Sequence, residues 1–146
     1  MKGFRREDFA RLHPGGALGR RLLTRVADVM VDRDLPTLPL SASMREVVVA
    51  LARGRGLALA VEEGRLCGVF TPGDLTRLMQ READFTGIPF ETVVNTSPKV
   101  AHASELGSAV VYRMELHGIM AMPVLDDGGA VVGVVHLHDL MRSGAA

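Results

Sequence analysis

The chain has 146 residues with 17 acidic and 17 basic side chains, so its formal net charge is zero. A neutral chain has no general attraction to nucleic acid or to an anionic membrane surface, and we expect neither as a partner. No apolar stretch approaches the ~18 residues needed to cross a bilayer, and the basic N-terminus lacks the apolar core of a secretory signal. The single cysteine, Cys67, excludes an internal disulfide. Together these features predict a cytoplasmic globular protein.

The N-terminal segment is predicted to contain the end of a helix at residues 6–12. The sequence Pro14-Gly15-Gly16 stops it, because proline and paired glycines do not continue a helix. His13 would be displayed on this constrained turn, or it would pair with the last carbonyls of the helix. Too few residues precede the helix to pack it, so we expect this segment to belong to a larger structure.

The remainder of the chain is predicted to be one α/β unit written twice. Residues 68–75 have the sequence Gly-Val-Phe-Thr-Pro-Gly-Asp-Leu, and residues 133–140 have the sequence Gly-Val-Val-His-Leu-His-Asp-Leu. In both copies an apolar run leads to a polar residue, and an acid three positions later opens an amphipathic segment. This pattern is typical of a strand, a turn and a helix.

Each copy is predicted to fold as β-α-β-β-α, with a small sheet, two helices and an acid- and glycine-rich hairpin turn. The expected elements of the first unit are a strand at 36–38, a helix at 43–53, strands at 56–61 and 66–70, and a helix at 72–80. Those of the second unit are at 98–100, 104–117, 118–124, 131–135 and 136–142. Short helical leads at 26–30 and 90–94 precede the two units. Units of ~55 residues would be marginal alone, so we expect a shared core.

The first helix of each unit has apolar residues at helical spacing that are predicted to face the core. They are Met44, Val47, Val48 and Leu51 in the first unit, and Leu106, Ala109, Val110 and Met114 in the second. The methionines at 114, 120 and 122 favour packing over a cofactor site, because methionine fills irregular gaps. No cofactor is expected.

The turn between the last strand and the last helix of the first unit carries the chain's most informative polar residues. Thr71 is placed as an N-cap, with Pro72 at the first helical position and Asp74 three positions after the cap, which is the spacing of a capping box. The same place is suited to an anionic ligand, since free N–H groups at a helix N-terminus bind phosphate and a carboxylate binds ribose hydroxyls. The two roles are compatible.

In the second unit His136 takes the place of Thr71, followed by His138 and by Asp139 at the position of Asp74. A His-x-His metal site has no further ligand pattern to support it, so no metal is expected. His136 is instead predicted to face a ligand. Elsewhere no catalytic constellation is evident, because no serine has a nucleophile-elbow context and Cys67 has no adjacent histidine.

The duplicated unit, with its Gly-x-x-Thr-x-x-Asp sequence, resembles a tandem pair of CBS (cystathionine-β-synthase-type) domains, the Bateman module. The resemblance covers residues 26–142 and implies an α+β fold with two units related by a pseudo-twofold axis. It also implies a homodimer, because CBS pairs bury apolar helix faces against a second pair. The residues expected to be exposed for this purpose are Leu75, Leu78, Met79, Leu140 and Met141.

A second resemblance is more specific. Residues 8–23, with the sequence Asp-Phe-Ala-Arg-Leu-His-Pro-Gly-Gly-Ala-Leu-Gly-Arg-Arg-Leu-Leu, are similar to the segment that joins the sugar-isomerase domain to the CBS pair in bacterial D-arabinose-5-phosphate isomerases. The sequence His-Leu-His-Asp-Leu at 136–140 also fits that family. Its members interconvert ribulose 5-phosphate and arabinose 5-phosphate on the route to the lipopolysaccharide sugar Kdo. The resemblance implies that His13 is catalytic in the full-length parent, which is tetrameric.

The chain itself departs from that family because the sugar-isomerase domain is missing. We therefore expect a regulatory fragment that is not an enzyme on its own. The predicted divisions are a remnant of the isomerase domain and linker at 1–25, a first CBS domain at 26–82, a linker at 83–89 and a second CBS domain at 90–146.

The resemblance implies a cleft that binds an anionic nucleotide or nucleotide sugar, with CMP-Kdo as first candidate and AMP or ATP as second. A ligand-free dimerisation module is the alternative. The candidate ligand-binding residues are Thr37, Leu38, Thr71, Asp74, Lys99, Val100, Met120, His136, His138 and Asp139. Because of His136 and Lys99, the second cleft is expected to be the more polar, and Asp139 to matter more than Asp74.

Overall fold

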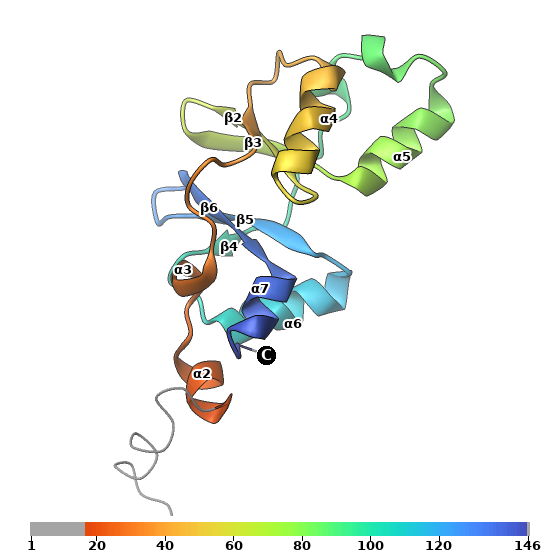
Figure 1. Ribbon diagram of the computed structural model, residues 1–146. Coiled ribbons are helices and arrows are strands. Elements are labelled where there is room, and N and C mark those ends of the chain that lie inside the picture. Colours follow the sequence, from red (N-terminus) through yellow and green to blue (C-terminus); the bar gives the residue numbers. More distant parts are fainter. Residues whose placement is uncertain (1–16, 146) are drawn as a thin grey trace, which may run out of the picture.

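A computed structural model describes residues 17–145 of the chain (Figure 1). The helix expected at residues 6–12 and the turn with His13 lie outside this range. In chain order the first elements are α2 (Ala17–Leu23), α3 (Val26–Val29), β1 (Thr37–Leu38), α4 (Met44–Arg53), β2 (Ala58–Glu62), β3 (Arg65–Phe70), α5 (Pro72–Arg81), η1 (Phe85–Gly87) and η2 (Phe90–Thr92). The remaining elements are β4 (Ala101–His102), α6 (Gly107–His117), β5 (Ala121–Leu125), β6 (Val131–His136) and α7 (Leu137–Arg142).

The two predicted β-α-β-β-α units are present, each with its own three-stranded sheet. In the first sheet β1 pairs parallel to β2, and β2 pairs antiparallel to β3; β4, β5 and β6 repeat this arrangement in the second. Each hairpin has a register irregularity at the equivalent place, between Ala60 and Val61 and between Val124 and Leu125. The α+β duplication expected from the sequence is therefore confirmed. The two units also have a bulge at the same place, which the sequence did not predict.

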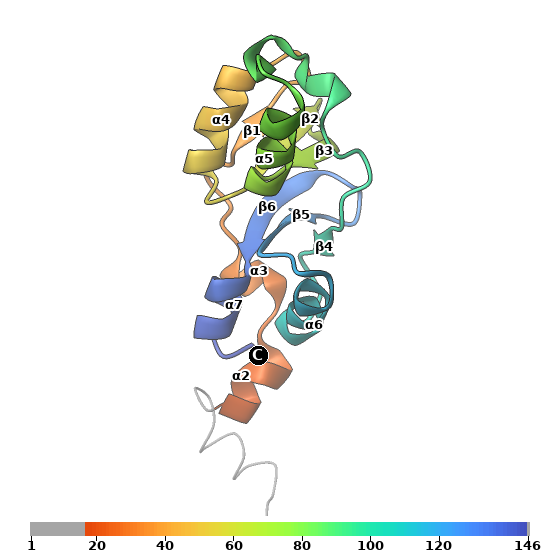
Figure 2. The same cartoon turned by 90° about the vertical axis from the view of Figure 1, so that its right-hand side faces the viewer.

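Each unit has its own buried core and a third, smaller cluster joins them, so the single shared core expected from the units' small size is present only in part. Figures 1 and 2 show the first unit at one end of the molecule, the second at the other, and the two sheets next to each other between them. A buried cluster joins Leu57, Leu59 and Val69 of the first unit to Val134 of the second. The hairpin tips also meet, because Arg65 donates a hydrogen bond to the Gly128 carbonyl at 3.0 Å. Part of each sheet is therefore buried against the other unit.

The short leads cross over between the units. Val26, at the start of α3, is fully buried in the core of the second unit, and its backbone N–H donates to the Glu105 carbonyl at 2.9 Å. Phe90, at the start of η2, packs in the core of the first unit, where its ring meets that of Phe70 edge to face at 5.9 Å. Each lead therefore precedes one unit in sequence and packs against the other.

The first strand of the second unit is misplaced in the prediction, which put it at 98–100 rather than at Ala101–His102. Pairing with β5 decides the register: Ala101 lies opposite Val124 just as Leu38 lies opposite Ala60. The sequence match between the two prolines, at 36 and 98, hides one additional residue between proline and strand in the second unit.

Several apolar helical residues face the other way from their predicted side. Leu78 and Leu140 were expected to be exposed and are buried in the cores, whereas Val48, which was assigned to the core, is exposed. Ala109 is exposed as well. Successive helical residues point ~100° apart, so neighbours can differ in burial, as the buried Val47 and the exposed Val48 do. Met79 and Met141 are exposed as expected.

No helix between residues 17 and 145 has the length and apolar character needed to span a membrane.

Candidate functional site

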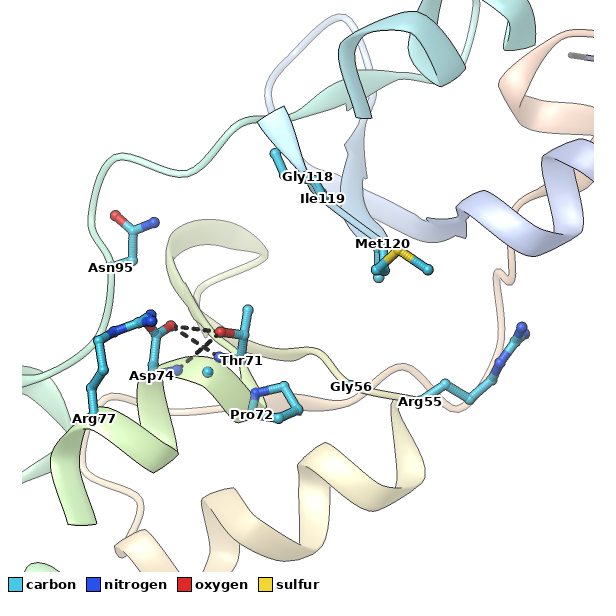
Figure 3. Close-up of a pocket in the computed structure, with 12 residues that line it drawn as sticks. Arg55, Gly56, Thr71, Pro72, Asp74, Arg77, Asn95, Gly118, Ile119 and Met120 are labelled. Atoms are coloured by element: carbon cyan, nitrogen blue, oxygen red, sulfur yellow. Dashed lines mark hydrogen bonds and ion pairs between the residues drawn. The ribbon is translucent and has the colours of Figure 1, made fainter. Parts of the chain in front are cut away.

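A hollow of about 620 Å³ lies between the units, where the turn after β3 faces the start of β5 (Figure 3). Both units contribute to its lining. The residues are Arg55, Gly56, Thr71, Pro72, Gly73, Asp74, Arg77, Asn95, Gly118, Ile119, Met120 and Ala121. The first unit thus supplies polar and charged groups, and the second supplies a mostly apolar wall.

The turn after β3 is held by the capping box expected from its sequence. The Thr71 backbone N–H donates to Asp74 Oδ2 at 3.0 Å, and the Asp74 backbone N–H donates to Thr71 Oγ1 at 3.2 Å. Pro72 occupies the first helical position, where no N–H is required. This rigid turn positions the Asp74 carboxylate at the pocket (Figure 3).

Arg77 adds a cation to the same part of the pocket. Its Nη2 donates to Asp74 Oδ1 at 2.7 Å, and two thirds of its side chain remain exposed. Asn95, from the segment that joins the units, lies near Arg77 in Figure 3. These groups can bind the hydroxyl and phosphate oxygens of a ligand, since carboxylates accept from hydroxyls and guanidinium groups donate to phosphate.

The opposite wall is formed by the residues that enter β5. Gly118 ends α6 in the left-handed conformation, with φ of 66°, and turns the chain into this wall. Met120 is 54% exposed, in contrast to Met114 and Met122, which are fully buried. An exposed methionine suits an apolar ring, because its thioether makes favourable contacts with aromatic groups. The methionine packing prediction is correct for Met114 and Met122, and Met120 lies at the pocket.

The turn after β6 differs in its bonding. His136 occupies the N-cap position of α7 but its side chain caps no backbone N–H. Asp139, the counterpart of Asp74, instead receives two hydrogen bonds from Arg55 of the first unit, Nη1 to Oδ2 at 2.9 Å and Nη2 to Oδ1 at 3.2 Å. Arg142 of α7 donates to the same carboxylate. Both carboxylates thus accept bonds from protein groups, but the donors to Asp74 are Thr71 and Arg77 of its own unit, whereas Asp139 is bound across the units by Arg55.

Arg55 also sets the electrostatics of this turn. Its hydrogen bonds, above all, lower the pKa of Asp139 from its ordinary value. Burial is the main cause that lowers the pKa of the His136 imidazole, and the nearby Arg55 charge lowers it further. Both effects favour the neutral imidazole of His136, and as a buried group it is poorly placed to attract an anion.

The structure brings three of the ten candidate ligand residues together, namely Thr71, Asp74 and Met120. The others lie elsewhere. Thr37 lines a separate hollow with Asp34, Leu35 and Arg53. Leu38 packs against the first unit's core, Lys99 and His138 are exposed, His136 is buried, Asp139 is paired with Arg55, and the Val100 carbonyl accepts a hydrogen bond from Arg113.

Sequence reasoning missed Arg55, Arg77 and Asn95. Arg77 had a signal, because it is one helical turn after the capping acid and side chains at that spacing lie on one face. The signal for Arg55 was weaker. Arg55-Gly56 aligns with His117-Gly118, so both pairs lie at the link between the first helix and the hairpin of a unit. Within residues 17–145, no three His, Cys, Asp or Glu side chains gather in a way that could hold a metal ion.

The fold and pocket define a class of protein, a tandem α+β module with a ligand-sized hollow between its two units. The sequence profile of the CBS domain matches residues 26–81 and 91–146. The chain belongs to the CBS domain family, and it forms a CBS pair.

Similar proteins place this pair more narrowly. Arabinose 5-phosphate isomerase KdsD of Pseudomonas aeruginosa is 40% identical over 146 residues, which are 98% of this chain and 45% of that protein. The chain thus spans less than half the length of this relative. Among solved structures, protein PAE2072 of Pyrobaculum aerophilum complexed with AMP is similar with a TM-score of 0.71 and 26% identity, over 84% of this chain and 99% of that one. The CBS domain pair of protein MJ0100, in complex with 5'-methylthioadenosine and S-adenosyl-L-methionine, has a TM-score of 0.70 and 26% identity, over 82% and 94%.

Proposed function

We propose that the chain is the regulatory CBS pair of an arabinose-5-phosphate isomerase, and that the hollow beside Thr71 binds an anionic nucleotide or nucleotide sugar. The observation that carries this proposal is the pairing of Asp74 and Arg77 with an apolar wall around Met120 in one pocket. The adenosine-containing ligands of the two similar structures support a nucleoside. The resemblance to the isomerases supports CMP-Kdo as first candidate, with AMP or ATP as second.

In this proposal the ligand's sugar hydroxyls donate to Asp74, its phosphate lies near a guanidinium, and its base packs against the residues entering β5. The parent protein is then a cytoplasmic isomerase of the Kdo route to lipopolysaccharide, a tetramer whose CBS pairs dimerise, and it is regulated by a nucleotide. No nucleic acid or membrane takes part.

Thermal unfolding in the presence of CMP-Kdo, CMP, AMP and ATP tests the binding proposal. A ligand at about 100 times its dissociation constant adds about 2.7 kcal/mol of stability, so a binder raises the melting temperature by several degrees. The Asp74→Asn variant should lose most of this shift. Absence of any shift at millimolar concentration, or an equal shift in Asp74→Asn, would contradict the proposed site.

An activity assay tests the assignment of the chain as a regulatory part. The 146-residue chain should show no conversion of arabinose 5-phosphate above a tag-only control. Measurable turnover would mean that residues of the CBS pair itself carry the reaction.

A dimerisation module without a ligand is the second candidate, and exposed apolar side chains favour it. Val49 on α4 is 60% exposed, and Tyr112 and Leu116 on α6 are 67% and 63% exposed. We propose that a second copy covers such residues. Sedimentation at micromolar concentration should therefore show a homodimer, and the double variant Tyr112→Ser, Leu116→Ser should weaken it. A wild-type monomer would contradict both the dimer and this second function.

A further inference from the structure

Arg55 connects the surroundings of the two turns. It follows α4 and, with Gly56, lines the hollow beside Thr71, yet its guanidinium binds Asp139 in the other unit. Arg55 and Gly56 have φ angles of 55° and 96°, in the left-handed region, so the chain reverses sharply here. In Figure 3 the Arg55 side chain extends away from Thr71 and Asp74, past Gly56. Arg55 thus lines the pocket, but its guanidinium is bound to Asp139, away from Thr71 and Asp74.

The contact between Arg55 and Asp139 is one that another anion can displace. About half of the Arg55 side chain is exposed, so water reaches the pair from that side although Asp139 is only 16% exposed. Ion pairs at a protein surface typically shift an equilibrium by only ~1.4–5-fold, because water screens the charges. A phosphate group offers more charge and more acceptor oxygens than a carboxylate, and guanidinium binds it in the same two-bonded geometry. Asp139 keeps the Arg142 side chain as a partner if Arg55 leaves.

We propose that Arg55 exchanges partners when a phosphorylated ligand enters the hollow, leaving Asp139 and binding the phosphate. This inference rests on the proposed nucleotide binding. The ion pair then competes with the phosphate of a ligand for Arg55. When the ligand breaks the pair, α7 of the second unit loses a contact, so binding in the pocket changes the bonding of α7. Arg55 becomes the residue that distinguishes a nucleotide from its nucleoside.

Isothermal titration with AMP and adenosine, and with CMP and cytidine, tests the exchange. Asp139→Asn frees Arg55 and should tighten nucleotide binding by about 2–5-fold, the strength of the exposed pair. Arg55→Gln removes the phosphate partner and should weaken nucleotide binding by about 10–100-fold, the value of a hydrogen-bonded charge. Neither change should alter nucleoside affinity. Arg142→Gln, which leaves Arg55 in place, is the matched control and should produce no tightening.

The double variant Arg55→Gln, Asp139→Asn separates partner exchange from a general loss of negative charge. If Arg55 is the mediator, Asp139→Asn has no effect in the Arg55→Gln background. Tightening of equal size in that background would overturn the exchange, as would unchanged nucleotide affinity in Asp139→Asn or in Arg55→Gln. Should Asp139→Asn fail to fold, the Arg55→Gln comparison of nucleotide with nucleoside decides alone.

Failure of the exchange is distinguishable from failure of the binding proposal. Nucleotides that bind all variants equally leave the pocket intact and overturn only the role of Arg55. If no variant binds any of the four probes, freeing Arg55 creates no phosphate site and the exchange is overturned, and the thermal-unfolding test with CMP-Kdo and ATP then decides the binding proposal.

Discussion

The turns after β3 and β6 hold equivalent places in two copies of one unit, but their acids are bonded differently. Thr71 closes a capping box and keeps the Asp74 carboxylate on its own helix. His136 caps nothing, and Asp139 is bound by Arg55 of the other unit. Replacing a hydroxyl by an imidazole at the N-cap thus leaves the acid available for a contact between units. In a diverged repeat, the same acid at the same spacing can serve a pocket in one copy and a cross-unit ion pair in the other.

The largest expected difference is in stability, and it concerns the residues just before the two turns. Phe70→Ala removes a fully buried ring that packs against Phe90, and it should cost about 3–5 kcal/mol of unfolding free energy. Val135→Ala, one residue before His136, removes two methyl groups from the other core and should cost about 2 kcal/mol. Urea denaturation measures both. Equal costs would mean that the first turn does not depend on the aromatic pair beneath it.

Replacing Asp74 and replacing Asp139 should have different effects on nucleotide affinity. Asp74→Asn should weaken nucleotide binding by about 1–3 kcal/mol, because a ligand hydroxyl loses a charged acceptor. Asp139→Asn should not weaken it. This reverses the order expected from the sequence, because Asp74 lines the hollow, whereas Asp139 is bound by Arg55 and neither it nor Lys99 lines the hollow. Titration calorimetry on both variants checks the order, and a larger loss in Asp139→Asn would restore the second turn as a ligand site.

The caps should differ on a smaller scale. Thr71→Ala removes the acceptor for the Asp74 N–H and should cost about 1 kcal/mol of stability, whereas Thr71→Ser keeps the hydroxyl and should cost little. His136 has no such bond to lose. Thermal unfolding of the two Thr71 variants measures the difference. Equal stability of Thr71→Ala and wild type would show that the capping box does not stabilise α5.

The fold follows from the sequence to a large extent, because the repeat and its apolar periodicity specify the same elements twice. What periodicity does not specify is which core a short apolar segment joins. Val26 and Phe90 precede one unit and pack in the other, since both cores lie within reach of the leads. One additional residue after Pro98 likewise displaces a strand that only pairing with β5 can place.

The site was predicted only in part, for a related reason. Thr71 and Asp74 were found because a capping box is a local pattern. Arg55 was missed because its partner is Asp139, far along the chain, and no local spacing indicates such a contact. Matching the two units by position also suggested that equivalent residues have equivalent roles, which the Arg55 pairing contradicts.

The smallest expected effect concerns pH and the buried His136. Its pKa in the folded state is lowered by burial and by the Arg55 charge, so below the unfolded value, about 6.5, the unfolded chain binds the proton more readily. Stability from this residue is therefore present above pH 6.5 and falls as the pH decreases toward the folded pKa. The lowered pKa of Asp139 acts in the same direction, but only in the more acidic range where carboxylates titrate. His136→Gln should flatten the dependence of unfolding free energy on pH just below 6.5, whereas His138→Gln, which changes an exposed residue of the same turn, should not. Urea denaturation at a series of pH values measures both slopes. An unchanged slope in His136→Gln would contradict a lowered His136 pKa in the folded chain.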